Sequence, residues 1–163
     1  MRIPRLIGPI IWLIAGGSFY LLLPWALSAL SPRIGWSNNS PGPWNLSAIV
    51  LILGGIVLIG WALGLHFVNA PRGWKVQLTP PHLLTAGPFR HTRNPMYLGG
   101  SAIWLGWALV YGSLIILGAF LIFVALVVFV VVPWEERQLE KQFGGEYIRY
   151  KNTVARWIPR RSK

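Results

Sequence analysis

Two adjacent carboxylates, Glu135 and Glu136, are the residues of this sequence whose type and position point most directly to chemistry. They open a group that holds every acidic residue of the chain within twelve positions: Glu135, Glu136, Glu140 and Glu146. Carboxylates that served only solubility would be scattered over a surface, so this confinement suggests that they are held for a ligand. The ligand should be cationic or rich in hydroxyl groups, because an ionised carboxylate only accepts hydrogen bonds.

A basic cluster precedes a long apolar segment, in the run GPFRHTRNPMYLG at 87–99. Just before Pro95, the run carries three basic residues: Arg90, His91 and Arg93. Pro95 predicts a helix start, because proline is well tolerated in the first helical turn. The free N–H groups and the dipole at such a helix end favour an anionic group.

The carboxylate pair is predicted to face the interior of a helix bundle. At about 100° per residue, Glu135 and Glu136 fall on the two flanks of an apolar stripe. That stripe is formed by Leu139 and Phe143. Buried charge must be paired or hydrogen-bonded, so the basic run is expected to supply donors. One pocket would then have cations and a helix N-terminus on one wall and two carboxylates on the other.

S-adenosylmethionine is a zwitterion that fits such a pocket, and we expect it as the cofactor. Its carboxylate suits the arginine side, its ammonium and ribose diol suit the glutamates, and its adenine suits a Trp or Tyr ring. Gly99 and Gly100, one turn into the predicted helix, would allow close approach by a flat ligand or by another helix.

Long hydrophobic segments must position these residues. The chain of 163 residues is 54% hydrophobic and contains ten Trp, which is typical of an integral membrane protein. A helix needs about 20 apolar residues to cross the hydrocarbon core. The sequence predicts an all-α fold with four transmembrane helices, at about 6–30, 47–67, 94–111 and 114–133. The last two should form a helical hairpin that turns at Gly112 and Ser113.

The tail at 134–163 continues the helical pattern beyond the last span. Its apolar residues recur at steps of three and four, as in an amphipathic helix at a lipid interface, and Gly144 and Gly145 should divide it. With four crossings, both termini and the loop at 69–93 share one side with fourteen of the fifteen Lys and Arg. Only Arg33 lies on the other side, so the positive-inside rule places both termini in the cytoplasm.

Composition limits what else the chain could be. The net charge of +11 could indicate nucleic acid, but the basic residues flank hydrophobic segments. Orientation and anionic lipid account for them, so we expect membrane lipids and no nucleic acid as partners. With no Cys, three His and four Glu, no metal centre is expected. We expect one membrane domain at 1–163, in which the loop at 31–45, rich in Pro, Gly and Asn, is a plain surface connector.

Two blocks flank the predicted hairpin: GPFRHTRNPMYLG at 87–99 and PWEERQLEKQFGGEYIRYKNTVARWIP at 133–159. In this order and separation they resemble the isoprenylcysteine carboxyl methyltransferase family and its phospholipid methyltransferase relatives. The resemblance covers roughly 83–159. It implies a membrane methyltransferase that binds S-adenosylmethionine between the blocks and receives its acceptor from lipid through a gap between helices.

The resemblance also implies roles for individual residues. The Arg-His-Pro form common in the family reads Arg93-Asn94-Pro95 here, so a hydrogen-bonding role would pass to the Asn94 amide. With the pocket argument, it gives these cofactor-binding candidates: Arg90, His91, Arg93, Asn94, Pro95, Tyr97, Leu98, Gly99, Glu135, Glu136, Tyr147 and Tyr150. Catalytic residues stay unassigned, because the sulfonium already activates its methyl group and positioning supplies much of the rate. The candidates are Arg156 and His91, of which His91 could take a proton.

The acceptor is expected to be lipophilic, or small and apolar. A prenylcysteine-like carboxylate is the most family-like choice, with a phospholipid amine or a thiol as alternatives. A nicotinamide-dependent membrane reductase and a small transporter also stay open. The spans hold no acidic residue or Lys for a proton relay, and the chain has no Gly-rich dinucleotide motif. The oligomeric state is open as well, since the second span has a small-residue face that could pack within or between chains: Gly54, Gly55, Gly60 and Gly64.

Overall fold

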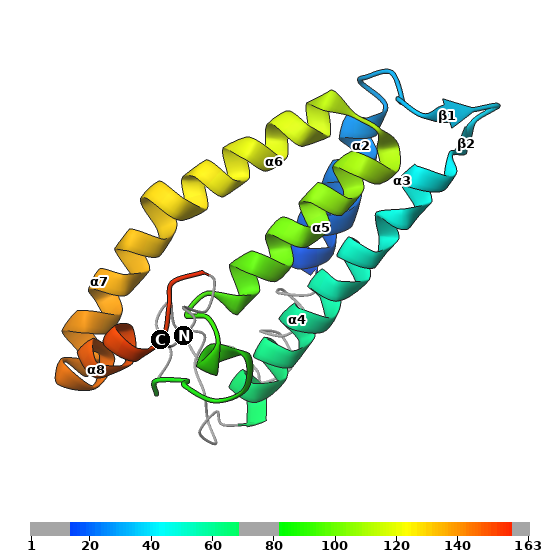
Figure 1. Ribbon diagram of the computed structural model, residues 1–163. Helices are drawn as coiled ribbons and strands as arrows, with labels where there is room; N and C mark the ends of the chain where they lie inside the picture. The colour runs from blue at the N-terminus through cyan, green and yellow to red at the C-terminus, as the bar shows by residue number, and fades with distance from the viewer. Residues whose placement is uncertain (1–13, 69–81, 158–163) are drawn as a thin grey trace, which may run out of the picture.

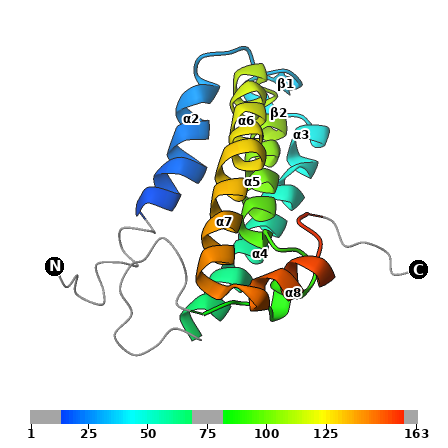
Figure 2. The same ribbon diagram turned by 90° about the vertical axis from the view of Figure 1, so that its left-hand side faces the viewer.

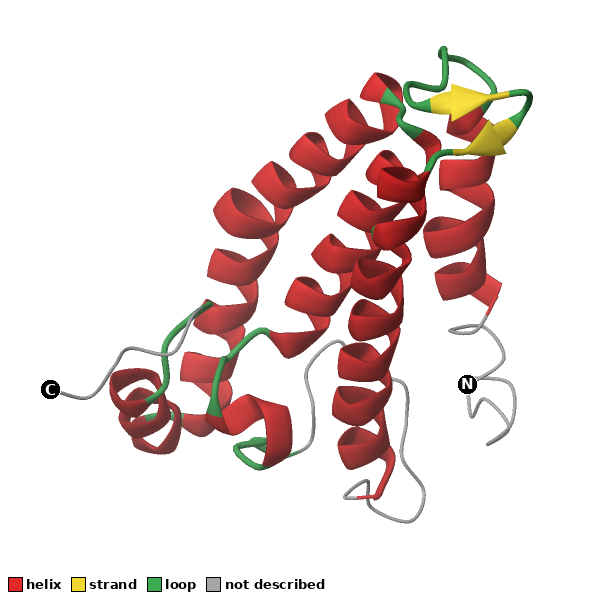
Figure 3. Ribbon diagram, turned by 45° about the vertical axis from the view of Figure 1, so that its right-hand side comes forward, coloured by secondary structure: helices red, strands yellow, loops and turns green. Residues whose placement is uncertain are grey.

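The computed structural model describes residues 14–68 and 82–157, which are mostly helical (Figures 1 and 3). In chain order the elements are η1 (Ser18–Leu22), α2 (Leu23–Ser28), β1 (Trp36–Ser37), β2 (Ser40–Pro41), α3 (Pro43–Ser47), α4 (Ile49–Val68), η2 (Gly87–Arg90), α5 (Pro95–Tyr111), α6 (Leu114–Leu126), η3 (Val127–Val131), α7 (Val132–Phe143) and α8 (Gly145–Thr153). Three predicted parts lie outside the described residues: the start of the first span (6–13), much of the middle loop (69–81) and the end of the tail (158–163).

Several of these helices run on into their neighbours and form longer rods. η1 and α2 belong to one helix, Ile14–Ser28, and α3 and α4 to another, Pro43–His66. α6, η3 and α7 together form Leu114–Phe143. The last two rods, of 24 and 30 residues, are long and apolar enough to cross a membrane. Large apolar side chains such as Val57 and Phe129 are exposed on them, which suits contact with lipid. The prediction of a helical, membrane-type fold is confirmed at this level.

The carboxylate pair lies on the longest rod rather than on a separate tail helix. Pro133 falls inside that rod, where proline removes one backbone hydrogen bond and crowds the preceding turn. The π-helical turn η3 lies directly before this point, and such wider turns are common where the hydrogen-bond ladder is interrupted. The helix therefore continues to Phe143 and carries Glu135 and Glu136 in its last segment.

The helices α4 and α5 form the most extensive helix pair in the described residues. They approach backbone to backbone: a Cβ at Gly99 would lie 2.8 Å from the carbonyl oxygen of Gly55 and from a side-chain carbon of Ile59. Gly100 faces the ring of Tyr20 in η1. The sequence left two uses open for these glycines, close approach by a flat ligand or by another helix. The structure shows close packing against other helices.

An aromatic cluster ties α5 to the helices on its other sides. Trp104 of α5 is buried, and its ring centroid lies 5.2 Å from that of Phe19 in η1 and 6.3 Å from that of Phe123 in α6. Ile116 of α6 is fully buried in the same cluster. Because α5 is packed by α4, α6 and the N-terminal helix, both of its ends have defined neighbours.

The connection between α5 and α6 consists of Gly112 and Ser113, the two residues at which a turn was predicted. Gly112 has a φ of +56°, a left-handed conformation that glycine adopts without strain. Ser113 caps α6, since its hydroxyl accepts a hydrogen bond from the Ile116 amide at 3.3 Å.

The loop at 31–45 is an ordered structure, so its description as a plain connector was wrong. It contains the antiparallel pair β1–β2, with Asn38 and Asn39 in left-handed conformations between the strands (Figure 3). Asn45 is completely buried (0% exposed), and its amide donates to the carbonyl oxygens of Ile34 at 3.2 Å and Leu109 at 2.8 Å. Composition marks asparagine as a loop residue but does not reveal that a buried amide with backbone partners fixes the loop.

Candidate functional site

The two sequence blocks meet at one end of the bundle, away from β1 and β2 (Figures 1 and 2). After α7, the short helix α8 folds back across this end, and the chain beyond it lies against the start of α5. The Arg93 amide donates to the Ala155 carbonyl at 3.0 Å. Thr92 Oγ1 and Asn94 Nδ2 both donate to the Arg156 carbonyl, each at 3.0 Å. The Asn94 amide therefore holds the C-terminal segment in place.

The carboxylate of Glu136 is buried between two arginines. It is 6% exposed, and its Oε1 lies 3.0 Å from Arg93 Nη1. Arg156 donates to both oxygens, from Nε at 3.1 Å and from Nη2 at 2.5 Å. This bidentate geometry is the most specific contact between a guanidinium and a carboxylate, and its hydrogen bonds raise the pKa of Arg156. Two cations and one anion leave this cluster with one net positive charge.

The carboxylate of Glu135 has a different environment from that of its neighbour. It is half-buried, and its Oε1 accepts a hydrogen bond from the Tyr97 hydroxyl at 2.9 Å. In the described parts of the chain, no arginine or lysine forms an ion pair with it. Among the described residues, Glu135 therefore retains acceptor capacity for a further hydrogen-bond donor beside the Tyr97 hydroxyl.

Two tyrosines of α8 complete this end of the molecule. Tyr147 and Tyr150 are buried, with ring centroids 6.1 Å apart. The Tyr150 hydroxyl donates to the Phe89 carbonyl at 2.7 Å, which fixes α8 against η2. Burial raises the pKa of both phenols, and the charge of Glu136 adds to the rise at Tyr147. Both hydroxyls therefore stay protonated and neutral near neutral pH.

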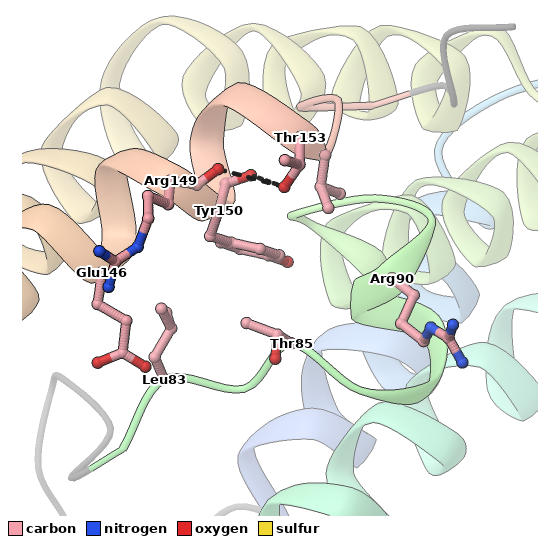
Figure 4. Close-up of a pocket in the computed structure, with 8 residues that line it drawn as sticks. Leu83, Thr85, Arg90, Glu146, Arg149, Tyr150 and Thr153 are labelled. Atoms are coloured by element: carbon pink, nitrogen blue, oxygen red, sulfur yellow. Dashed lines mark hydrogen bonds between the residues drawn. The ribbon is translucent and has the colours of Figure 1, made fainter. Parts of the chain in front are cut away.

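An open pocket of about 500 Å³ lies between α8 and the chain that leads into η2 (Figure 4). Its lining residues are Leu83, Thr85, Arg90, Glu146, Arg149, Tyr150, Thr153 and Val154. Figure 4 shows Arg90 on the side of the pocket away from Glu146 and Arg149. Arg90 and His91 are exposed, and in the described structure neither forms a hydrogen bond or an ion pair with Glu135 or Glu136.

The phospholipid methyltransferase family matches residues 44–146, which is more than half of the chain. The chain belongs to this family. Methanethiol S-methyltransferase 1 of Bradyrhizobium diazoefficiens is 30% identical over 154 residues, which cover 85% of this chain and 50% of the relative. Phosphatidylethanolamine N-methyltransferase of Homo sapiens is 30% identical over 77 residues, which cover 47% of this chain and 39% of the relative. The chain thus spans about half the length, or less, of these curated relatives, and no solved structure matches it.

The donors and acceptors of this member of the phospholipid methyltransferase family fit the zwitterionic end of S-adenosylmethionine. Arg93 Nε is buried and has no hydrogen-bond partner among the described residues. An orphaned donor in a cluster with net positive charge suits a carboxylate. Glu135 suits an ammonium or a ribose hydroxyl. Both sets of groups lie at the same end of the bundle.

The remaining candidates have structural positions in this family member. Pro95 is buried and begins α5, the Leu98 amide donates to the Asn94 carbonyl at 3.1 Å, and Gly99 faces α4. Sequence reasoning missed Thr92. Its hydroxyl also accepts a hydrogen bond from the backbone N–H of Asn94 at 3.3 Å. A threonine two residues before asparagine in a turn was the available signal. No group of three or more potential metal ligands occurs in the described residues.

Proposed function

We propose that this chain is a membrane methyltransferase that uses S-adenosylmethionine. The observation that carries the proposal is the contrast within the carboxylate doublet. Glu136 is paired with Arg93 and Arg156. Glu135, the adjacent residue, accepts a hydrogen bond from Tyr97 and can accept another from a ligand. The family match supports methyl transfer over the nicotinamide-dependent reduction and the transport that the sequence left open.

Each residue of the site would have a binding or a positioning role. Arg93 would receive the methionine carboxylate, and Glu135, oriented by Tyr97, would receive the ammonium or the ribose hydroxyls. S-adenosylmethionine would supply an electrophilic methyl group on its sulfonium. Glu136, through Arg156, would hold the C-terminal segment over the site, which excludes water and fixes the geometry of the donor.

The names of the two relatives favour a thiol or a lipid amine as acceptor over the prenylcysteine carboxylate that is most family-like. The acceptor sulfur or nitrogen would form a bond to the methyl carbon as the donor sulfur releases it, and the acceptor would lose a proton. His91 is exposed and has no hydrogen bond to either carboxylate in the described structure, so we do not assign it as the base. The acceptor would enter from the bilayer.

We further propose that 1–163 form one membrane domain with four spans, the last two as a hairpin, and with both termini in the cytoplasm. The chain contains no Cys, so single cysteines can be introduced without background. In intact cells, a membrane-impermeant maleimide should label Asn38→Cys and not Arg149→Cys. Labelling of both or of neither would contradict this topology.

The decisive experiment measures binding of S-adenosylmethionine to the purified chain in lipid nanodiscs by calorimetry. The wild type should bind, and Glu135→Gln should bind about tenfold more weakly, because one charge-assisted contact is lost. Glu140→Gln is the matched control, since it removes one charge from the same helix at an exposed ion pair with Lys151. Absence of binding by the wild type, or equal affinity in all three proteins, would refute the assignment.

A further inference from the structure

The end of the bundle opposite to the carboxylates holds one cation in an unusual environment. Arg33, in the loop before β1, lies with its guanidinium carbon 4.6 Å from the ring centroid of Trp36 and 5.6 Å from that of Tyr111. The two rings are stacked on each other, with centroids 6.1 Å apart and an angle of 15°. Cation–π contact holds a guanidinium by its face and leaves the N–H groups at its edge available.

No acidic side chain of the described residues is near enough to use those N–H groups. All four carboxylates of the sequence fall between Glu135 and Glu146, at the other end of the bundle (Figure 1). Among the described residues, the Arg33 guanidinium makes no hydrogen bond and no ion pair, so its charge is not compensated by a side chain there.

Arg33 lines a hollow of which one wall is tied to α5. An open pocket of about 590 Å³ is lined by Arg33, Trp36, Asn38 and Asn39. Trp36 Nε1 donates to the Val110 carbonyl at 2.9 Å, which anchors this wall to the last turn of α5. A fixed cation beside polar amide side chains is suited to an oxyanion.

Large apolar side chains are exposed in the same part of the chain as this hollow. Ile34, Trp44 and Leu46 are 52%, 48% and 47% exposed. Apolar side chains and Trp rings of this kind insert at the membrane–water interface, where a neighbouring arginine reaches the level of the lipid phosphates. This arrangement favours a lipid over a free inorganic ion.

We propose that the hollow formed by Arg33, Trp36, Asn38 and Asn39 binds the phosphate of an anionic phospholipid, at the end of the bundle opposite to the carboxylate site. The guanidinium edge would donate to the phosphate oxygens, and the acyl chains would lie against the neighbouring apolar side chains. This site is independent of the methyl-transfer proposal, because it shares no residue with that site.

Native mass spectrometry of the detergent-solubilised chain with phosphatidylglycerol tests this proposal. The wild type should retain the lipid, and Arg33→Gln should lower its affinity about fivefold. Arg137→Gln, which removes an exposed arginine at the other end, should not change it. Arg33→Lys should fall between wild type and Arg33→Gln, because lysine keeps the charge and loses the planar stacked donor.

Because Arg33 is exposed, the substitutions should leave the fold intact. Circular dichroism shows whether each variant retains its helices. Equal lipid retention by the wild type and Arg33→Gln would overturn the proposal. A further titration with inorganic phosphate separates the two sources of the anion. Displacement of the lipid by equimolar phosphate would overturn the lipid assignment, and retention of the lipid would support it.

Discussion

The two ends of α5 hold arginine in opposite ways. At its start, Arg93 and Arg156 pair with the buried carboxylate of Glu136, and the backbone of 155–156 is hydrogen-bonded to 92–94. At its end, Arg33 lies exposed against two aromatic rings, with no carboxylate beside it in the described structure. A buried guanidinium requires an internal anion, whereas an exposed one can be oriented by ring faces and remain ready for an external anion.

The largest loss of stability should follow from removing the buried carboxylate at the start of α5. Glu136→Gln leaves Arg93 and Arg156 without their shared anion, and it should lower the free energy of unfolding by about 3 kcal/mol. Thermal unfolding in detergent, followed by circular dichroism, measures the loss. Arg33→Gln is the matched control at the opposite end and should unfold near the wild-type temperature. Equal stability of wild type and Glu136→Gln would remove the distinction between the two ends.

A smaller effect is expected from the uncharged network that supports the Arg33 end. Asn45→Ala removes three hydrogen bonds, two that its side-chain amide donates to the carbonyl oxygens of Ile34 and Leu109 and one that its oxygen accepts from the Gly42 backbone amide. It should destabilise the protein by about 2 kcal/mol. Chemical unfolding in a mixed micelle measures this loss. Asn152→Ala, at an exposed position of α8, should have little effect. A similar result for both variants would show that the loop adds nothing to stability.

The two tyrosines at the ends of α5 offer a direct pairwise test. Tyr97→Phe removes the hydrogen bond to Glu135 and should cost about 1 kcal/mol of stability, with weaker binding of S-adenosylhomocysteine. Tyr111→Phe keeps the ring that contacts Arg33, and it should change neither quantity. Calorimetric titration and thermal unfolding of both variants provide the comparison. If Tyr111→Phe were the more damaging change, the assignment of roles along α5 would be wrong.

The smallest effect should come from an ion pair that lies outside both regions. Glu140 and Lys151 join α7 to α8, and both side chains are 38% exposed. Exposed pairs contribute about 0.5 kcal/mol, so Glu140→Gln should lower stability by no more than that. A loss as large as that of Glu136→Gln would mean that burial does not decide which pairs matter here.

Local signals in the sequence were enough to place the main elements. Gly112 and Ser113 mark the turn, and Gly144 separates α7 from α8 with a φ of +53°, because these positions need conformations or caps that few residues supply. The helical phase of Glu135 and Glu136 also predicted that they face the bundle, and the two sequence blocks were expected to converge.

The sequence could not show which of the two glutamates, Glu135 or Glu136, pairs with arginine. Arg156 lies twenty positions after Glu136 and reaches it only because α8 folds back, so no local pattern links the two. The phase of a helix gives the same answer for both glutamates and does not say which one meets a guanidinium. Arg90 and His91 were assigned to the site by the pocket argument and the family resemblance, and with exposed side chains their part in it stays a prediction.

The unbroken rod Leu114–Phe143 couples the carboxylates to the thickness of the surrounding bilayer. Its 30 residues extend about 45 Å, of which the apolar part at 114–133 extends about 30 Å and matches a hydrocarbon core of about 30 Å. Such a rod tilts as acyl chains shorten, and its polar end then shifts sideways relative to the start of α5. The acyl-chain length of the lipid would therefore change the position of Glu135 and Glu136 relative to the start of α5.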